Sequence, residues 1–518
     1  MATATEQGAA HSDVAEEYVD VLIVGAGISG IGAAFYLQRD HPERSYAVLE
    51  ARAVTGGTWD LFRYPGVRSD SDLHTFGYDF KPWKSDYALA DGADILAYIR
   101  ETAAENGIEQ KIRTGHRVTR ANFDSAAASW TVEGERSDGT SFQIRSNFLF
   151  IGTGYYNYEA AYTPEFPGLE EFKGELIHPQ FWPEDLDYSG KRVVVIGSGA
   201  TAVTLIPAMA PKTEHITMLQ RSPTYIMPLP AKDPVTIGLK RVFGYERGYM
   251  MARQWITKQQ ATFYNLCQSH PRLMRNFIRR TNKRMLPKDY PVDVHFKPKY
   301  GPWDQRLCAV PNGDLFKAIS SGRAEVVTDQ IERFDATGIQ LQSGRHLDAD
   351  IVVTATGLKL LACGGIEASI DGRPVKLNDH LAFRGMMLSG IPNMVFLIGY
   401  TNSSWTLKVC LVCQHFMRML SYMDEHGYNK VCAEPPYPGM STRPLLDFSA
   451  GYVQRALDDF PRQGTYQPWQ QNMSVKLDTE LLHDGPVEDR HLIFERVGGA
   501  EAEHHDSPSQ ITNVEVVR

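Results

Sequence analysis

The sequence predicts an α/β fold that contains two similar strand–turn–helix units, one near the start of the chain and one in its middle. Each unit has a short run of β-branched apolar residues, a glycine-rich turn and a stretch with helical spacing. The first occupies about residues 18–37 and the second about residues 192–209. Two more apolar runs, 147–151 and 349–353, end in small residues and flank the second unit. Strands that alternate with helices in this way are typical of parallel sheets.

The turn of the first unit is Gly25-Ala-Gly27-Ile-Ser-Gly30. Gly25 permits a tight turn, Gly27 lets a pyrophosphate approach the backbone, and Gly30 lets the helix pack on the strand. The helix would offer free N–H groups and the positive end of its dipole to phosphates. A second strand, 46–49, ends at Glu50, where a carboxylate can accept hydrogen bonds from a ribose. The unit therefore predicts a Rossmann-like dinucleotide site.

The second unit repeats this pattern with one difference in charge. Its turn is Gly197-Ser-Gly199-Ala-Thr-Ala202, and its next strand, 215–219, is followed by Gln220-Arg221-Ser222 instead of an acid. A guanidinium can pair with a ribose 2′-phosphate, which a carboxylate such as Glu50 would repel. The middle site should therefore bind NADPH and the first site FAD. The alternative for Arg221 is a solvated surface charge.

The flanking runs indicate how these two units are connected. We interpret them as the two links that join an inserted NADPH domain to a discontinuous FAD domain. The expected parts are a disordered tail at 1–17, the first part of the FAD domain at 18–157, the NADPH domain at 158–360, and the rest of the FAD domain with a C-terminal segment at 361–518. A Lys- and Arg-rich helical subdomain is expected at about 229–300; its cations are either a solvated face or steer an anionic cofactor.

Composition excludes several other classes of function. The 518 residues carry a net charge of −9, which offers no field for nucleic acid, and no apolar run approaches the roughly 20 residues of a membrane span. We expect a cytoplasmic protein. The six cysteines show no disulfide framework or metal-ligand spacing, and Cys410 and Cys413 have the spacing of a buried helix, so we expect inert core thiols, with redox or metal chemistry as the alternative, and no metal site.

Three classes of flavoenzyme combine FAD and NADPH sites: disulfide reductases, flavin monooxygenases that act on N and S atoms, and Baeyer–Villiger monooxygenases. A disulfide reductase needs a thiol pair beside the flavin, commonly soon after the first turn. The first cysteine of this chain is Cys267. The sequence therefore disfavours that class.

Two motifs resemble a particular family. Phe172-x-Gly174-x-x-x-His178-x-x-x-Trp182-Pro183 is similar to the fingerprint of type I Baeyer–Villiger monooxygenases. The segment 56–70, with its Gly-Gly-x-Trp start and Asp70 at its end, resembles the family's other signature. The similarity runs from about 18 to 406 and is closest to the bacterial branch that includes the ethionamide-activating monooxygenase. The resemblance implies that His178 and Trp182 belong to a linker between domains, so we do not expect His178 to be a catalytic base.

The resemblance also implies a reaction. It predicts an NADPH-consuming monooxygenase that inserts one oxygen atom of O₂ into ketones, giving esters or lactones through a C4a-peroxyflavin and a Criegee adduct, and that also oxidises sulfides. Arg306 matches the family's active-site arginine and Asp70 the carboxylate that pairs with it. Many members have Lys before that arginine, whereas this chain has Gln305. The alternative is a physiological S- or N-oxygenase.

The expected cofactor contacts combine the two turns with positions that the resemblance implies. For FAD they are Gly25, Gly27, Ser29, Gly30, Glu50, Gly57, Thr58, Trp59, Asp60, Leu61, Asp70 and Val118. For NADP they are Arg68, Ser69, Gly197, Ser198, Gly199, Ala200, Thr201, Ala202, Val203, Arg221, Ser222 and Gln305. The expected partners are a small ketone or sulfide and O₂, in a monomer or weak homo-oligomer. The pattern does not determine the native substrate.

Overall fold

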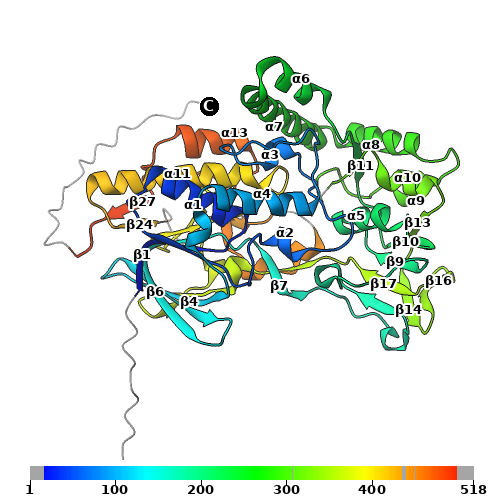
Figure 1. The fold of residues 1–518 in the computed structure, drawn as a ribbon, viewed down its shortest axis with the longest axis horizontal. Helices are drawn as coiled ribbons and strands as arrows, with labels where there is room; N and C mark the ends of the chain where they lie inside the picture. Colours follow the sequence, from blue (N-terminus) through cyan, green and yellow to red (C-terminus); the bar gives the residue numbers. More distant parts are fainter. Residues whose placement is uncertain (1–16, 306, 435–438, 448–449, 499–518) are drawn as a thin grey trace, which may run out of the picture.

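The computed structural model describes residues 17–305, 307–434, 439–447 and 450–498, and Figure 1 shows two sheets joined side by side. The expected N-terminal tail therefore lies outside the described residues, apart from Glu17, which begins the first strand. Arg306 and the end of the expected C-terminal segment lie outside them as well.

The larger sheet has nine strands in the order β20-β19-β4-β5-β6-β1-β2-β3, with β23 also paired to β6. Strands β3, β2, β1, β6 and β23 run parallel, whereas β5 is antiparallel to both its neighbours. The strands are β1 (Glu17–Val24), β2 (Tyr46–Leu49), β3 (Ile112–Arg113), β4 (His116–Asp124), β5 (Ser129–Arg136), β6 (Ser141–Ile151), β19 (Glu367–Ile370), β20 (Arg373–Pro374) and β23 (Met394–Phe396).

The second sheet is formed by a segment that lies between β6 and β19 in the chain. Its order is β13-β10-β9-β17-β8, and every pair is parallel. The strands are β8 (Glu175–Ile177), β9 (Arg192–Ile196), β10 (His215–Gln220), β13 (Ala324–Thr328) and β17 (Ile351–Thr354), with α5 (Ala200–Met209) and α10 (Asp314–Ser320) against them. The predicted α/β fold, with one Rossmann-like domain inserted in another, is confirmed.

A helical subdomain extends from the second sheet, at the top of Figure 1. It comprises α6 (Pro234–Phe243), α7 (Tyr245–Ser269), α8 (Pro271–Met285) and α9 (Val292–His295). Asp233 caps α6 by accepting a hydrogen bond from the Val235 N–H, and proline at the first position of α6 and α8 costs no helical hydrogen bond. Gly244, with φ +80°, separates α6 from α7.

Three long helices pack together on one face of the larger sheet: α1 (Ile28–Asp40), α4 (Gly92–Glu105) and α11 (Trp405–His426). Lys408 of α11 and Asp478 form an ion pair of 2.7 Å with no exposed surface on either side chain. Tyr400 and Asn472 donate hydrogen bonds to the same carboxylate, at 2.6 and 3.0 Å. This network fastens the C-terminal segment to the helix α11 that covers the larger sheet, because breaking a fully buried ion pair leaves an uncompensated charge.

Shorter elements complete the fold. They are α2 (Thr58–Leu61), α3 (Leu73–Phe76), α12 (Gly451–Gln454), α13 (Val475–Asp478), β7 (Tyr156–Ala161), β11 (Ile226–Leu229), β12 (Cys308–Pro311), β14 (Ile331–Asp335), β15 (Gly338–Leu341), β16 (His346–Asp348), β18 (Leu358–Leu360), β21 (Ala382–Phe383), β22 (Met387–Leu388), β24 (Lys430–Ala433), β25 (Thr442–Pro444), β26 (Arg462–Gly464) and β27 (Leu492–Glu495). Among the described residues, no helix has both the length and the apolar character that crossing a bilayer requires.

His415 is a buried titratable group in α11. Its Nδ1 lies 2.8 Å from the Leu482 carbonyl oxygen, and its Nε2 lies 2.9 Å from an Arg384 guanidinium nitrogen. These partners fit a neutral ring that donates from Nδ1 and accepts at Nε2. Burial, reinforced by the nearby Arg384 charge, lowers the pKa of His415 to about 3.

We expect His415 to make the protein less stable in mild acid. The pKa of a histidine in the unfolded chain is about 6.5. Between that pH and about pH 3, the unfolded state therefore binds a proton that His415 in the folded state does not. Stability should therefore fall as pH drops below about 6.5, by about 2 kcal/mol at pH 5. His415→Gln keeps an acceptor for Arg384 and removes this loss. Urea unfolding at pH 7.5 and 5 measures it.

His483→Gln is the matched control, because it removes a histidine at an exposed position without opening the core. It should show the same loss of stability in acid as the unchanged protein. Equal losses in the unchanged protein and in His415→Gln would contradict the assignment.

Candidate active site

A single cavity of about 750 Å³ lies between the two glycine turns. Gly25 and Gly27 line it from the first turn, and Gly197 and Gly199 line it from the second. The two turns, which are about 170 residues apart in the chain, therefore open into the same space. Two nucleotides bound at these turns would reach a common region.

The first turn requires glycine for steric reasons. Gly25 has φ +103°, and a Cβ on it would lie 2.7 Å from the Gly152 carbonyl oxygen. A Cβ on Gly30 would lie 1.8 Å from the Gly25 carbonyl oxygen. Gly27 is the N-cap of α1, and no side chain caps this helix. Its uncapped N–H groups therefore remain available for a phosphate at the cavity wall.

Glu50 holds the end of β2 next to this turn. Its carboxylate is buried and accepts hydrogen bonds from the backbone N–H groups of Ala26, at 2.9 Å, and Arg52, at 3.0 Å. Burial raises the pKa of Glu50, whereas the two backbone donors act in the opposite direction. Glu50 lines the cavity, and each carboxylate oxygen keeps a further lone pair with which it could accept from a ribose hydroxyl.

The second turn has the same construction. Gly197 has φ +137°, and a Cβ there would lie 2.3 Å from the Ala355 carbonyl oxygen. Gly199 is the N-cap of α5, which also lacks a side-chain cap, and a Cβ on Gly199 would meet no protein atom within 4 Å. The open space at Gly199 and the uncapped N-terminus of α5 fit a second pyrophosphate.

Arg221 and Gln305 line the cavity near this second turn. Arg221 is exposed and forms no hydrogen bond or ion pair with another described residue. Its guanidinium is therefore available to a ligand. Ser222 does not line the cavity; its carbonyl oxygen is 3.4 Å from the Ser198 hydroxyl.

Arg68, Ser69 and Asp70 lie where the two sheets meet, and all three line the cavity. The Arg68 side chain is largely buried and pairs with Asp314 of α10 at 2.6 Å, so it joins the two Rossmann-like parts. Asp70 is half-buried. Arg306, expected to act with Asp70, lies outside the described residues, whereas the preceding Gln305 lines the cavity.

Most expected cofactor contacts line the cavity, but a few do not. The exceptions are Gly30, Asp60, Leu61, Ala202 and Ser222. Asp60 is almost fully buried, and its carboxylate pairs with Arg52 at 2.7 Å and Arg100 at 2.8 Å. These ion pairs therefore fix α2 in place, and Thr58 and Trp59 of the same helix line the cavity.

Sequence reasoning missed several residues that line the cavity. Tyr156 and Tyr158 come from β7, directly after the first link between the sheets, and Arg455 comes from the C-terminal segment. The Arg455 guanidinium lies 3.4 Å from the centre of the Tyr162 ring. The aromatic run 155–158 was a usable signal, because tyrosines just after a strand that ends in small residues are suited to line a ligand site. Arg455 has no comparable local pattern.

His178 also lines the cavity. Its Nδ1 accepts a hydrogen bond from the Gln180 backbone N–H at 3.1 Å. Burial lowers the pKa of His178, so the ring is neutral at pH 7. Trp182, four residues further on, packs partly buried against the core of the second sheet.

A second cavity of about 270 Å³ adjoins the first. Tyr155, Gln305 and Tyr452 line both cavities. Other residues that line the smaller cavity are mostly polar: Thr401, Asn402, Arg443, Asp447, Gln463, Gln471 and Asn472. The smaller cavity thus lies beside the residue that precedes Arg306.

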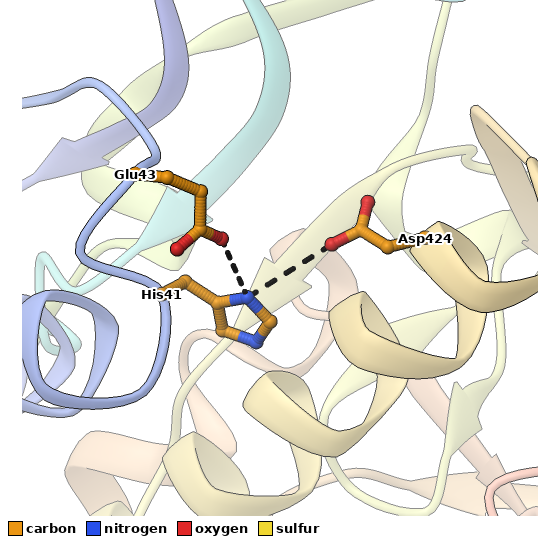
Figure 2. A group of neighbouring side chains, drawn as sticks. All are labelled: His41, Glu43 and Asp424. Atoms are coloured by element: carbon orange, nitrogen blue, oxygen red, sulfur yellow. Dashed lines mark hydrogen bonds and ion pairs between the residues drawn. The ribbon is translucent and has the colours of Figure 1, made fainter.

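Figure 2 shows a separate group, His41, Glu43 and Asp424, where the C-terminal ends of α1 and α11 meet. The His41 Nδ1 is 3.2 Å from a Glu43 oxygen and 3.9 Å from an Asp424 oxygen. Its Nε2 is 2.9 Å from the Met417 carbonyl oxygen. Arg44 pairs with the same Asp424. Because both ring nitrogens already have protein partners, we interpret the group as a tie between the two helices.

Cys410 and Cys413 lie within the buried side of α11. Burial raises the pKa of the Cys410 thiol to about 12 and raises the pKa of Cys413 well above its usual range. Both thiols are therefore protonated at pH 7 and unsuited to act as nucleophiles.

Comparison with known proteins identifies the family of this chain. A model of the flavin-binding monooxygenase-like family matches residues 67–370, and a model of an NAD(P)-binding Rossmann-like domain matches residues 23–88. The chain belongs to the flavin-binding monooxygenase family, and it is a flavin-dependent monooxygenase.

Individual relatives resemble nearly the whole chain. The FAD-containing monooxygenase EthA of Mycobacterium tuberculosis (strain ATCC 25618 / H37Rv) is 52% identical over 92% of this chain and 98% of the relative. The probable FAD-binding monooxygenase AlmA of an Acinetobacter species is 47% identical over 93% of this chain and 97% of the relative. Among solved structures, an oxidized steroid monooxygenase bound to NADP has a TM-score of 0.72 at 23% identity and covers 92% of this chain and 99% of its own. That likeness confirms the fold.

Gly199→Ala tests whether a nucleotide lies at the N-terminus of α5. The new methyl group would touch no protein atom, so the thermal midpoint and FAD content should not change. It would occupy the space in which we place the pyrophosphate, so the KM for NADPH should rise about tenfold or more. Steady-state NADPH oxidation measures this effect. Gly238→Ala in α6 is the control, because a Cβ there would also meet no protein atom within 4 Å. If the two variants have the same KM for NADPH, no nucleotide lies at the N-terminus of α5.

Proposed function

We propose that this flavin monooxygenase is of the Baeyer–Villiger type. It would use FAD and NADPH to insert one oxygen atom of O₂ into ketones, giving esters or lactones, and it would also oxidise sulfides. The observation that carries the proposal is the single cavity that joins both glycine turns and is lined by Asp70 and by Gln305, the residue before Arg306. The sequence fingerprint at 172–183 supports the same reaction type.

The two cofactors are assigned by charge. FAD would occupy the turn at Gly25, where Glu50 can accept hydrogen bonds from the ribose and would repel a 2′-phosphate. NADPH would occupy the turn at Gly197, where the exposed Arg221 can pair with that phosphate. The use of both cofactors is supported by solved structures of similar fold, of which one is bound to NADP and another is in complex with FAD and NADP.

Arg221→Ala should affect the KM for NADPH and leave the KM for NADH almost unchanged. One charged contact to the phosphate contributes roughly 1.5–3 kcal/mol, so the KM for NADPH should rise about 10- to 100-fold while that for NADH barely changes. Arg323→Ala, at an exposed position beside β13, is the control and should alter neither. An equal loss with both nucleotides would refute the assignment of Arg221.

The active centre in this proposal comprises Arg306 and Asp70. Bound, reduced FAD supplies the reaction with O₂. Arg306 would hold a negatively charged oxygen and the substrate carbonyl oxygen together, because a guanidinium cannot lose its proton at working pH. Asp70 would orient that guanidinium. Tyr156, Tyr158 and Trp59 line the cavity and would exclude water from it.

The substrate would enter the smaller cavity. Its volume of about 270 Å³ and its walls shared with the cofactor cavity, at Tyr155, Gln305 and Tyr452, support this placement. Its polar lining favours a ketone that carries further polar groups over one whose substituents are purely aliphatic.

Arg306→Ala and Arg306→Lys test the reaction type. Both variants should still oxidise NADPH, whereas ester formation should fall by about 100-fold or more, with hydrogen peroxide released instead. Parallel measurements of NADPH loss and of ester product with a ketone make this comparison. Lys299→Ala, at an exposed position nearby, is the control. Ester formation at the original rate would overturn the role of Arg306, and sulfoxide as the only product from a ketone–sulfide pair would favour an S-oxygenase.

A further inference from the structure

The helical subdomain has a charge opposite to that of the rest of the chain. Residues 234–285 contain eleven Lys and Arg but a single acidic residue, Glu246, whereas the whole chain carries −9. No residue of this segment lines the large cofactor cavity. The positive charge is therefore concentrated on a part of the molecule that contributes nothing to the walls of the larger cavity.

Four of these cations have partners within the protein. Lys240 pairs with Asp86 and Arg279 with Asp293, while Arg253 and Arg275 donate to backbone carbonyl oxygens. The other seven are exposed and form no hydrogen bond or ion pair with a side chain in the described ranges: Arg241, Arg247, Lys258, Arg272, Arg280, Lys283 and Arg284. These seven cations are available to an external partner.

The same helices expose apolar side chains to an unusual extent. Ten of the eighteen large hydrophobic residues that are exposed in the described part of the chain lie in this segment of 52 residues. They are Val235, Val242, Phe243, Tyr245, Met250, Met251, Trp255, Leu266, Leu273 and Phe277. Apolar surface concentrated in this way marks an interaction site rather than ordinary scatter.

In α8 the apolar and cationic side chains share one face. Leu273, 63% exposed, and Phe277, 49% exposed, are followed at helical spacing by Arg280 and Arg284. The opposite face, with Met274 and Ile278, is buried. Exposed Met251, Trp255 and Lys258 form a similar row on α7. A helix with apolar residues beside Lys and Arg is typical of one that lies in the plane of a membrane interface.

We propose that the outer face of α6, α7 and α8 docks on an anionic lipid surface. Seven unpaired cations complement lipid phosphates, and the exposed aliphatic and aromatic side chains would enter the boundary of the acyl chains. A symmetric dimer through this face would bring two positive surfaces together. Figure 1 places the three helices at the outer edge of the molecule. Tyr264 of α7 lines the smaller cavity, so docking would hold the cavity in which we propose that the substrate binds close to the membrane surface.

Flotation of the FAD-loaded, full-length protein with lipid vesicles tests this inference. We expect binding to vesicles of phosphatidylcholine with 30% phosphatidylglycerol, no binding to phosphatidylcholine alone, and release in ~0.5 M NaCl because salt screens the charges. The variant with Arg272, Arg280, Lys283 and Arg284 all changed to Gln, and the variant with Trp255, Leu273 and Phe277 all changed to Ser, should each bind at least tenfold more weakly.

Matched controls remove the same kinds of side chain elsewhere. One changes Lys212, Arg323, Arg373 and Lys376 to Gln, and the other changes Leu477 and Ile493 to Ser; both should bind like the unchanged protein. Unchanged NADPH oxidation and FAD content show that each variant is folded. The inference is overturned if the unchanged protein does not float with vesicles that contain phosphatidylglycerol, or if the helical variants bind as well as the controls. It is also overturned if light scattering shows that the unchanged protein is a dimer and the Ser variant a monomer, while the binding of both to vesicles is equal.

Discussion

Two helix N-termini without a side-chain cap face the same cavity, and the rest of the structure depends on keeping them open. Any side chain at Gly25 or Gly197 would collide with a backbone carbonyl oxygen, of Gly152 in the first case and of Ala355 in the second. Those two carbonyls belong to the links between the sheets, which follow β6 and β17. Each glycine turn therefore packs closely against one of the links that connect the two sheets.

The ion pair between Arg68 and Asp314 also connects the two sheets. It connects the loop that carries Asp70 to α10 of the inserted domain, and it is largely shielded from solvent. Asp60 of α2 forms ion pairs with Arg52 and Arg100. These pairs fix the position of α2, whose residues Thr58 and Trp59 line the cavity. Residues that do not touch a ligand thus determine where those that do are placed.

Local sequence patterns predicted the strands and glycine turns that surround the site. The positions of other residues at the site depend on contacts between distant segments. The strands 46–49 and 192–196 were predicted with the bounds that the structure shows, because each is a short apolar run that ends at a residue of a different kind, Glu50 in the first case and Gly197 in the second. Asp60 was expected near the flavin, yet it does not line the cavity; its buried carboxylate pairs with Arg52 and Arg100, which no motif connects to it. The contributions of Tyr452 and Arg455 depend on how the C-terminal segment folds back, which only tertiary contacts determine.

The wall between the two cavities shows why substrate preference cannot be derived from a motif. Tyr155 follows the first link, Gln305 follows the helical subdomain, and Tyr452 comes from the C-terminal segment. These three segments reach one place from different parts of the chain. The link at 152–154 also packs against the first glycine turn, so Tyr155 lies next to both that turn and the wall of the smaller cavity. The shape of the smaller cavity thus depends on contacts between three distant segments, which no single motif specifies.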